Sequence, residues 1–242
     1  MNSGSVSHHL SAKAAAFVHS VLALNPKVAA FDCDSTLWQG DSGRDFMYWE
    51  IEHKLISEEV SRWVLGRYQE YLGGKVSEEE MCGEMVQIHR NIPVARIIAA
   101  AQRFFAEVVE HRIFPEMRHL VQRLHERGCE IWAVSSTNDW VVIEGVKRFG
   151  IPQERVLATT VSVVNGIATR ELVQVPSGEG KAVALRKSLT RRLDASFGNS
   201  IHDTAMLSMA NHAFAINANP DLAEIARQKG WTIYQPEMPE KD

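Results

Sequence analysis

Four short segments of the sequence carry side chains that could act together in chemistry. The first, Phe31–Leu37, places the carboxylates of Asp32 and Asp34 two residues apart. Carboxylates this close repel each other unless a proton or a cation lies between them. A hard cation such as Mg²⁺ prefers carboxylate and carbonyl oxygens, so the segment indicates a metal site. A pair of solvated loop acids would show the same spacing, and this segment alone does not separate the two.

The other three segments add hydroxyl groups, a lysine and a further acid. They are Ala133–Thr137, Gly178–Lys181 and Gly198–Asp203. Hydroxyls and free amides at Ser135 and Ser136, where a strand meets a helix, favour a bound phosphate. Lys181, at a helix start, could neutralise the charge of that phosphate. Taken singly, these residues are more typical of a helix cap and a solvated lysine, but the ordered set of four segments favours one common site.

Strands and helices alternate around these segments. Short apolar or β-branched stretches predict strands at Val28–Phe31, Glu130–Val134, Val156–Val164, Ile167–Val175, Ala195–Phe197, Ala213–Ile216 and Trp231–Tyr234. The alternation predicts an α/β fold with a mostly parallel sheet. Asn165-Gly166 predicts a hairpin between two of the strands. In open sheets of this kind, ligands bind beyond the carboxyl ends of the strands, where three of the four segments lie.

The stretch 42–111 has a helical pattern throughout and contains no predicted strand. Ser57 and Ser77, each followed by glutamates, are typical helix starts. We therefore expect a small all-helical cap over residues 42–111, inserted after the first strand. The core would then comprise residues 1–41 and 112–242. At roughly 150 residues per domain, a chain of 242 residues is long enough for such a core and a smaller insert.

Composition and charge narrow the class of protein. The net charge is −4, from 26 basic and 30 acidic residues, whereas nucleic-acid binders usually carry a basic excess. Cys33, Cys82 and Cys129 form no CxxC pair, so we expect reduced thiols in a cytoplasmic protein. No apolar run is long enough to cross a membrane, and Ser11–Leu24 fits an amphipathic helix better than a secretion signal. We expect neither nucleic acid nor a membrane as partner, and a monomer or a homodimer.

Together the four segments resemble the haloacid dehalogenase (HAD) superfamily, in particular its phosphoserine-phosphatase-like branch, over about Val28–Trp231. The resemblance implies a three-layer, Rossmann-like parallel sheet core, with the helical insert as a cap over the substrate. It implies that Asp32 attacks phosphorus and forms an aspartyl-phosphate, while Asp34 acts as general acid and then general base. The function that follows is a Mg²⁺-dependent phosphatase acting on a small phosphorylated metabolite.

The resemblance also assigns binding residues. Those implied to hold the phosphate are Ser135, Ser136 and Lys181, and those implied to bind Mg²⁺ are Asp32, Asp34, Asn199 and Asp203. Asn199 departs from the family pattern, which usually has an aspartate there. An amide oxygen can bind Mg²⁺ but removes one negative charge, so we expect weaker metal binding or a shifted role for Asp203. A weakly active or inactive relative that binds a phospho-ligand stays open. So does a phosphotransferase or phosphomutase, which would pass the phosphoryl group to an acceptor other than water.

Three residues near these segments could contact the substrate. Asp41 matches the position at which phosphoserine phosphatases hold the substrate amine, whereas the cap position of their carboxylate-binding arginine is Gly83 here. Phosphoserine is therefore disfavoured, and a phosphorylated compound with an amine headgroup stays open. Trp38 is a candidate for an aromatic cage around such a cation, while Phe46 in the following helix is expected to pack the cap against the core. His202 could touch the substrate or be a surface histidine.

Overall fold

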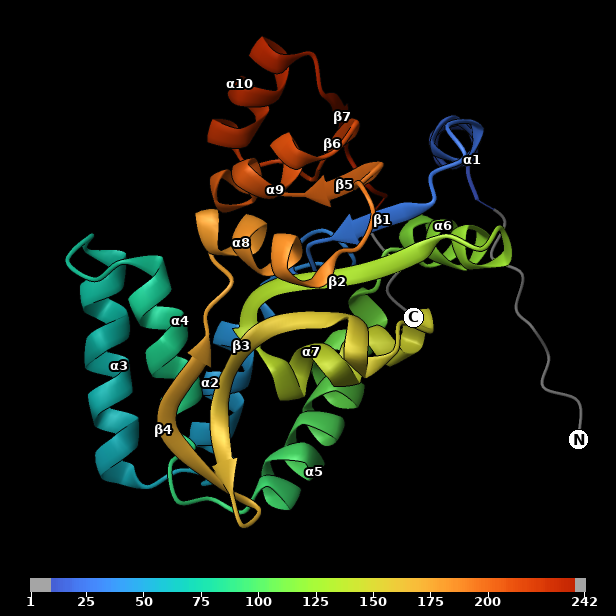
Figure 1. Cartoon of the computed structure of the whole chain (residues 1–242). Helices are drawn as coiled ribbons and strands as arrows, with labels where there is room; N and C mark the ends of the chain where they lie inside the picture. Colours follow the sequence, from blue (N-terminus) through green and yellow to red (C-terminus); the bar gives the residue numbers. More distant parts are fainter. Residues whose placement is uncertain (1–9, 238–242) are drawn as a thin grey trace, which may run out of the picture.

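The structure is a computed structural model that describes residues 10–237 (Figure 1). Within these residues the centre is a seven-stranded sheet with the order β4-β3-β2-β1-β5-β6-β7. The strands are β1 (Val28–Phe31), β2 (Glu130–Asn138), β3 (Val156–Val164), β4 (Ile167–Gln174), β5 (Ala195–Gly198), β6 (His212–Ile216) and β7 (Thr232–Tyr234). Neighbouring strands are parallel except for β4, which pairs antiparallel with β3. The predicted α/β fold and the predicted hairpin are confirmed.

Helices cover both faces of the sheet, so the core has three layers. The helices of one face are α1 (Ala12–Ala23), α6 (Pro115–Glu126) and α7 (Asp139–Val146), and those of the other are α8 (Glu179–Ser188), α9 (Thr204–Met209) and α10 (Pro220–Lys229). Along β1, Ala29 and Phe31 pack with the first group, while Val28 and Ala30 pack with α8 and α9. All four side chains are fully buried. Burial on both faces explains why this strand is a continuous apolar run.

Between β1 and α6 the chain forms the helical insert. Its helices are α2 (Ser42–Glu52), α3 (Glu58–Leu72), α4 (Glu78–Gln87) and α5 (Val94–Phe104), followed by a π-helical turn and a 3-10 turn that ends at Arg112. The side chains of Asp41, Ser57 and Ser77 cap α2, α3 and α4 by accepting hydrogen bonds from main-chain amides. The all-helical insert after the first strand is confirmed, whereas the domain boundaries at residues 42 and 111 stay a prediction.

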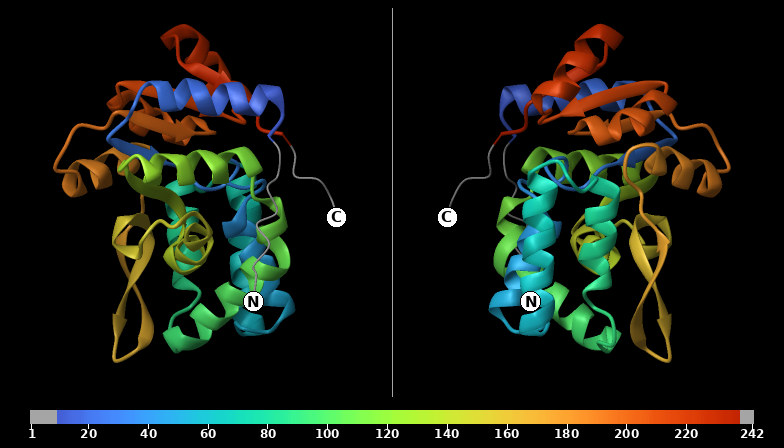
Figure 2. Two further views of the ribbon diagram at one scale, coloured as in Figure 1. Left: turned by 90° about the vertical axis from the view of Figure 1, so that its right-hand side faces the viewer. Right: turned by 90° about the vertical axis from the view of Figure 1, so that its left-hand side faces the viewer.

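The insert is packed in two parts. Phe46 of α2 and Phe104 of α5 belong to the same hydrophobic cluster as β1, which confirms that Phe46 packs the insert against the core. Helices α3 and α4 form a separate cluster around Val64, Tyr68 and Met81. Figures 1 and 2 show the insert and the β3–β4 hairpin extending from the same side of the sheet. Helix α4 also lies against β2, β3 and β4, which brings its first turn close to the ends of the parallel strands.

Strand β2 is longer than the sequence predicts. The predicted end at Val134 is wrong, because after a register shift the strand continues to Asn138, which pairs with Thr159 of β3. Thr159 Oγ1 also donates a hydrogen bond to the main-chain oxygen of Ser136 at 2.6 Å. The hydroxyl-bearing residues 135–137 therefore lie in a strand rather than at a helix start. Asn138 caps α7 through its side chain.

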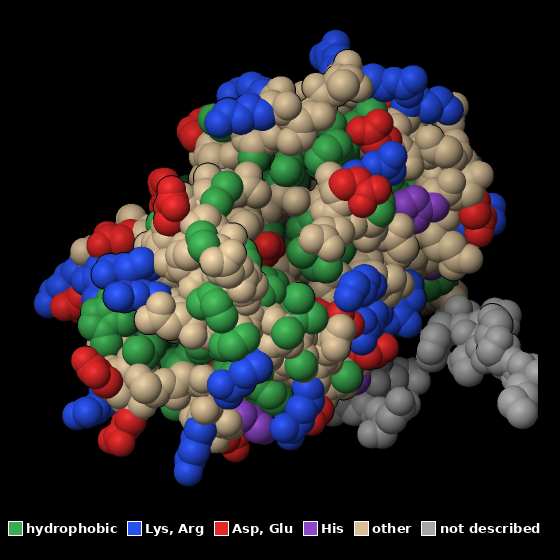
Figure 3. Space-filling model, turned by 60° about the horizontal axis from the view of Figure 1, so that its bottom comes forward, with side chains coloured by type: hydrophobic (Ala, Val, Ile, Leu, Met, Phe, Trp, Pro, Cys, Tyr) green, Lys and Arg blue, Asp and Glu red, His purple; other side chains and the backbone are tan. Residues whose placement is uncertain are grey.

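Two features of the described residues bear on possible partners. Within residues 10–237, no helix has both the length and the apolar composition that crossing a membrane requires. On the face shown in Figure 3, basic and acidic side chains are interspersed, with apolar side chains between them. This face has no continuous basic surface of the kind that binds nucleic acid. Cys33, Cys82 and Cys129 are free thiols.

Candidate active site

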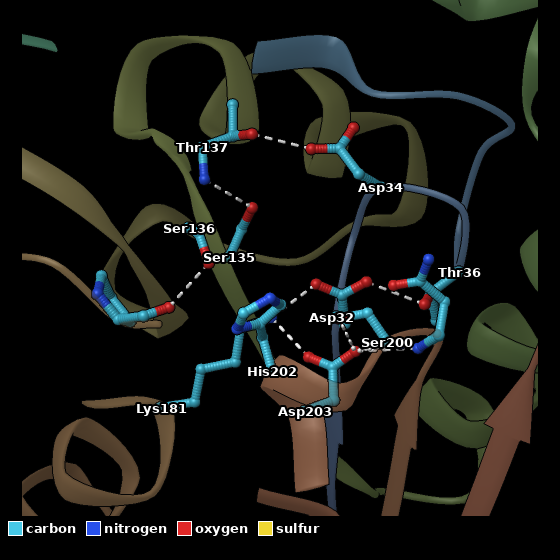
Figure 4. A network of polar contacts seen from close by, with 12 residues as sticks. Asp32, Asp34, Thr36, Ser135, Ser136, Thr137, Lys181, Ser200, His202 and Asp203 are labelled. Carbon is cyan, nitrogen blue, oxygen red and sulfur yellow. Dashed lines mark hydrogen bonds and ion pairs between the residues drawn. The ribbon is translucent and has the colours of Figure 1, made fainter. Parts of the chain in front are cut away.

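A buried ion-pair network joins three of the four segments (Figure 4). Lys181 Nζ donates hydrogen bonds to Asp32 Oδ1 at 2.7 Å and to Asp203 Oδ1 at 2.6 Å. All three side chains are buried. Thr36 Oγ1 donates to Asp32 Oδ2 at 2.8 Å, so both oxygens of the Asp32 carboxylate have partners. The structure thus brings Asp32, Lys181 and Asp203 to one point, and their individual roles stay predictions.

The alternation of side chains along β1 explains how Asp32 meets Lys181. Val28 and Ala30 point to the face that α8 and α9 cover. Asp32 is the next residue of that alternation, so its side chain points to the same face. Lys181 lies in the first turn of α8 and is buried on the side of that helix that packs on the sheet. The meeting of the two charged groups therefore follows from the strand and the helix that carry them.

A close approach at the end of β5 positions Asp203. A Cβ at Gly198 would lie 2.6 Å from the Cβ of Asp203, a distance that real side chains do not reach. Asp203 Oδ2 accepts hydrogen bonds from the main-chain amides of Asn199 and Ser200, at 2.8 and 3.0 Å. These amides orient the Asp203 carboxylate so that its other oxygen meets the lysine. Glycine at position 198 is therefore a requirement of the site.

The charge balance of this network perturbs its pKa values. Burial, and then the neighbouring Asp203 carboxylate, raise the pKa of Asp32 from 3.8 to about 7, although Lys181 acts to lower it. Burial alone would lower the pKa of Lys181, but the Asp203 and Asp32 carboxylates raise it. The lysine is therefore charged. One ammonium does not fully compensate the carboxylates around it, and further positive charge would be favourable here.

Asp34 lies beside the network and is held by three hydrogen-bond donors. Asp34 Oδ1 accepts from Trp38 Nε1 at 2.8 Å and from the main-chain amide of Ser42 at 2.7 Å. Asp34 Oδ2 accepts from Thr137 Oγ1 at 2.7 Å. The donors come from the loop after β1, from the start of the insert and from β2. They fix the orientation of a carboxyl group that is a candidate for proton transfer.

Trp38 is enclosed in the protein, so the structure does not favour an aromatic cage there, and its contact with a substrate stays a prediction. Its side chain is fully buried, and its ring packs edge-to-face against Phe105 with ring centroids 5.4 Å apart. A Cβ at Gly145 would lie 2.8 Å from the same indole ring. The ring thus packs against the protein itself. Its indole N–H orients Asp34 instead.

The hydroxyl groups of β2 are engaged in the protein. Ser135 is buried, and its Oγ accepts a hydrogen bond from the main-chain amide of Thr137 at 3.1 Å. Ser136 Oγ donates to the main-chain oxygen of Pro176 at 3.1 Å. The segment therefore lies between Asp34 and the loop that leads to Lys181, as Figure 4 shows. A phosphate-binding role for Ser135 and Ser136 stays a prediction, and the contact of Thr137 with Asp34 is one that the sequence does not predict.

Glu78 of α4 also belongs to the site, although the sequence analysis does not single it out. Its Oε1 accepts from Ser177 Oγ at 2.8 Å and from Ser136 Oγ at 3.3 Å, and its Oε2 lies 2.5 Å from His202 Nε2. Burial would raise the pKa of Glu78, but the hydrogen bond from His202 lowers it, and the same bond raises the pKa of His202. His202 thus contacts the insert in this structure. The only sequence signal is a helix start with three consecutive glutamates, which does not distinguish Glu78 from its neighbours.

Oxygen donors that suit a metal gather at the same edge of the sheet. Within residues 10–237, no three His, Cys, Asp or Glu side chains are grouped as metal ligands. A metal would therefore need oxygens of other kinds beside the carboxylates of Asp32 and Asp203, and the main-chain carbonyl of Asp34 and the amide oxygen of Asn199 are available candidates. An all-oxygen set of this kind suits Mg²⁺. The raised pKa of Asp32 is a second sign that a cation would be stabilised here.

Acidic groups of the insert lie near Asp34, and the nearby arginines are paired. Asp41 accepts a hydrogen bond from the main-chain amide of Arg44 at 2.9 Å. The protein packed around its carboxyl group, and then the Asp34 carboxylate, raise the pKa of Asp41 to about 6. Arg44 pairs with Asp45 at 2.7 Å, and Arg67 pairs with three glutamates of the insert. The position expected to hold an arginine, Gly83, lies against β4 instead.

Comparison with known proteins gives one family. The family model described as haloacid dehalogenase-like hydrolase matches residues 29–208. A phosphoserine phosphatase of Mycobacterium tuberculosis is 27% identical over 215 residues, which cover 85% of this chain and 69% of that protein. A histidinol-phosphatase of Neisseria meningitidis serogroup C is 27% identical over 222 residues, covering 85% of this chain and 97% of that protein. A crystal structure of a Bordetella pertussis protein of unknown function shares the fold, with a TM-score of 0.77 and 21% identity over 86% of this chain and 97% of that one.

Proposed function

The chain belongs to the haloacid dehalogenase-like hydrolase family. On that premise we propose that it is a phosphatase, which hydrolyses a small phosphomonoester through an aspartyl-phosphate on Asp32. The observation that carries the proposal is the buried contact of Lys181 with both Asp32 and Asp203, at 2.7 and 2.6 Å. A lysine held against a carboxylate at the carboxyl end of a parallel sheet provides a nucleophile and the positive charge that a phosphate needs.

Each charged side chain has one task in this mechanism. A carboxylate oxygen of Asp32 attacks phosphorus and displaces the alcohol, forming the acyl phosphate. The Lys181 ammonium reduces the repulsion between the anionic nucleophile and the anionic phosphate. Asp34 donates its proton to the departing alkoxide oxygen, and its carboxylate then takes a proton from the water that attacks the acyl phosphate. The three donors around Asp34 keep it oriented in both half-reactions.

A bound Mg²⁺ would supply additional charge compensation for the phosphoryl oxygens and the nucleophile. The residues that would hold it are Asp32, Asp203 and Asn199, together with the main-chain carbonyl of Asp34. Asn199 brings no charge to this set, so the affinity for the metal is expected to be lower than with an aspartate there.

The location of the protein in the cytoplasm remains a prediction from its cysteines.

The proposed substrate is a phosphate ester of a small alcohol that carries an amine or another cationic group and lacks a carboxylate. Asp41 places negative charge beside the site on the side of the insert. The arginines Arg44 and Arg67 are neutralised by acids of the insert itself, so neither is free to bind a substrate carboxylate. The named relatives act on phosphoserine and histidinol phosphate, both of which have an amine.

The first experiment measures hydrolysis of p-nitrophenyl phosphate with Mg²⁺ and with EDTA, for the wild type and for Asp32→Asn. We expect Mg²⁺-dependent release of phosphate by the wild type and a loss of at least about a thousandfold in the variant. Asp221→Asn, on the exposed first turn of α10, controls for the loss of one carboxylate remote from the site. Activity that survives in Asp32→Asn would refute the mechanism.

A second experiment compares histidinol phosphate, phosphoethanolamine and phosphoserine with an uncharged phosphate ester. We expect the highest kcat/KM for amine-bearing esters without a carboxylate, and a selective decrease for these esters in Asp41→Asn. Free phosphate as the only product, with added alcohols present, would exclude phosphoryl transfer to an alcohol.

Asn199 favours a second candidate, which is a protein that binds a phospho-ligand without turnover. Calorimetric titration with Mg²⁺ and vanadate, beside the turnover assays, separates the two candidates. Binding without turnover of any of these esters would support the second.

A further inference from the structure

The carboxylate of Glu78 contacts three separate loops of the core. Ser136 belongs to the end of β2, Ser177 to the loop before α8, and His202 to the turn after β5. Glu78 itself lies in the first turn of α4, in the insert. One side chain of the insert thus contacts the segments that lead to Ser135, Lys181 and Asp203. Figure 4 shows His202 beside Asp203.

The Glu78 carboxylate is largely covered by the protein, whereas its partner His202 is more open to water. The side chain of Glu78 is 18% exposed and that of His202 is 39% exposed. Both oxygens of the Glu78 carboxylate are engaged, Oε1 with the two hydroxyls and Oε2 with the imidazole. Hydrogen bonds to an ionised group are about twice as strong as neutral ones. Moving α4 away from the core would break all three contacts together.

The three partner loops have few other side-chain bonds to one another at this point. The single hydroxyl hydrogen of Ser136 is shared between Glu78 Oε1 at 3.3 Å and the main-chain oxygen of Pro176, next to Ser177, at 3.1 Å. His202 immediately precedes Asp203, whose carboxylate binds Lys181 at 2.6 Å. A shift of any of these loops would therefore move a group that the proposed mechanism uses. The carboxylate of Glu78 adds to these two links a contact from the insert to all three loops.

We propose that Glu78 is a positioning residue that couples the placement of α4 to the arrangement of the phosphate-binding loops. The inference rests on the proposed function for the meaning of these loops. When α4 is seated, Glu78 holds Ser136, Ser177 and His202 in place, and the loops present one complete site for a phosphate. When α4 is displaced, the loops lose these contacts and are held less firmly, and the phosphate is bound less tightly. Glu78 acts through these partners and does not react with the substrate.

The kinetic test compares Glu78→Gln, Glu78→Ala and Glu79→Gln. Glutamine keeps an oxygen acceptor for the two hydroxyls but removes the charge that faces His202, whereas alanine removes every contact. Glu79 is exposed in the same helical turn, so Glu79→Gln is a matched control for the loss of one charge at the start of α4. Assays use p-nitrophenyl phosphate, with inorganic phosphate as product inhibitor, and thermal unfolding confirms that each variant is folded.

We expect KM and the inhibition constant for phosphate to rise by about tenfold in Glu78→Ala, with kcat changed less than about threefold. Glu78→Gln should show a smaller rise of the same kind, and Glu79→Gln should stay within about twofold of the wild type. Wild-type KM and phosphate inhibition in a folded Glu78→Ala would overturn the proposal. A fall in kcat with KM unchanged would also overturn it, because it would indicate a chemical role.

Hydrogen exchange of the unliganded protein tests the same coupling without any assay of turnover. We expect the amides of residues 134–138 and 176–182 to exchange faster in Glu78→Ala than in the wild type, and to be unchanged in Glu79→Ala. Faster exchange confined to α4 would overturn the proposal, because it would show a contact that stabilises only its own helix. If the wild type hydrolyses no phosphate ester, the proposed function fails, while this measurement still decides the role of Glu78.

Discussion

Replacing Lys181 by methionine tests how the buried network is held together. The change keeps a long side chain in the same space and removes the ammonium that lies 2.7 Å from Asp32 and 2.6 Å from Asp203. All three side chains are buried, so water cannot replace the lost charge. Breaking a buried ion pair by removing one partner costs about 3–5 kcal/mol. We therefore expect Lys181→Met to lower the free energy of unfolding by an amount in this range at pH 8.

The stability lost in Lys181→Met should be larger at pH 8 than at pH 5. The pKa of Asp32 is raised from 3.8 to about 7 in the folded protein, so the folded state binds this proton more tightly than the unfolded state. This group therefore lowers the stability as pH rises from about 4 to about 7. Lys181 acts to lower that pKa, so its removal extends the loss to higher pH, by about 1.4 kcal/mol for each further pKa unit. At pH 5 both proteins have a protonated Asp32, and the difference should shrink to about 1–2 kcal/mol.

The measurement is urea unfolding followed by tryptophan fluorescence at pH 5 and pH 8, in EDTA. Lys187→Met, which removes an exposed lysine from the same helix, is the control and should change stability by less than about 0.5 kcal/mol. Adding Mg²⁺ should restore more stability to Lys181→Met than to the wild type, since a cation would then face two unpaired carboxylates. An equal loss at both pH values, or a larger loss at pH 5, would refute the reasoning.

Three further substitutions test single contacts. Gly198→Ala would place a Cβ 2.6 Å from that of Asp203. We therefore expect the free energy of unfolding in urea to fall by about 1–3 kcal/mol, and the thermal midpoint to respond less to Mg²⁺. A midpoint response equal to that of the wild type would contradict this. Burial raises the pKa of the Asp139 carboxyl group to about 6. Asp139→Asn removes this group, so the free energy of unfolding should be about 1–2 kcal/mol higher than that of the wild type at pH 8. At pH 4 the two proteins should be equally stable. Trp38→Phe removes the indole N–H that donates to Asp34. We expect turnover to fall by about tenfold and the free energy of unfolding to fall by about 1–3 kcal/mol. A folded variant with full turnover would argue against the orienting role.

The chemistry at the strand ends was predictable because it depends on local patterns. An apolar run followed by Asp32 is a buried parallel strand that opens onto a site, and the period of two along the strand decides which face the carboxylate takes. The placement of Asp32 requires only the secondary structure and the rule that parallel strands end at a common edge. Lys181 and Asp203, taken singly, are more typical of a solvated lysine and a capping residue, and only the resemblance of the ordered segments to a family pattern assigns them to the site.

The contacts of Trp38 and Glu78 were not predictable, because each depends on the path of irregular or distant chain. Trp38 follows a loop in which Ser35 has a positive φ of 58°, so no simple period tells where the indole points. Its burial is decided by Phe105 and Gly145, which are far away in the sequence. Glu78 resembles its two neighbours in the sequence, and only the seating of α4 against the sheet brings it to the loops.

The amide side chain of Asn199 keeps the negative charge of the site lower than an aspartate at this position would. Burial, and then the Asp203 carboxylate, already raise the pKa of Asp32 in the network around Lys181. An aspartate at position 199 would add a further negative charge next to Asp203, whose Oδ2 accepts from the amide of residue 199 at 2.8 Å. With no metal present, that charge would raise the pKa of Asp32 further and destabilise the fold at neutral pH. Asparagine therefore favours a protein that is stable, with an ionisable Asp32, before a cation binds.

The same reasoning gives opposite expectations for Asn199→Asp with and without the cation. In EDTA at pH 8 the variant should have a lower thermal midpoint than the wild type. With Mg²⁺ it should bind at least about tenfold more tightly, because the added carboxylate faces the ion at close range. Thermal shift over a Mg²⁺ series measures both effects, and Asn217→Asp, at the end of β6, controls for the added charge. Equal Mg²⁺ affinity in Asn199→Asp and the wild type would place the ion elsewhere and remove Asn199 from its ligands.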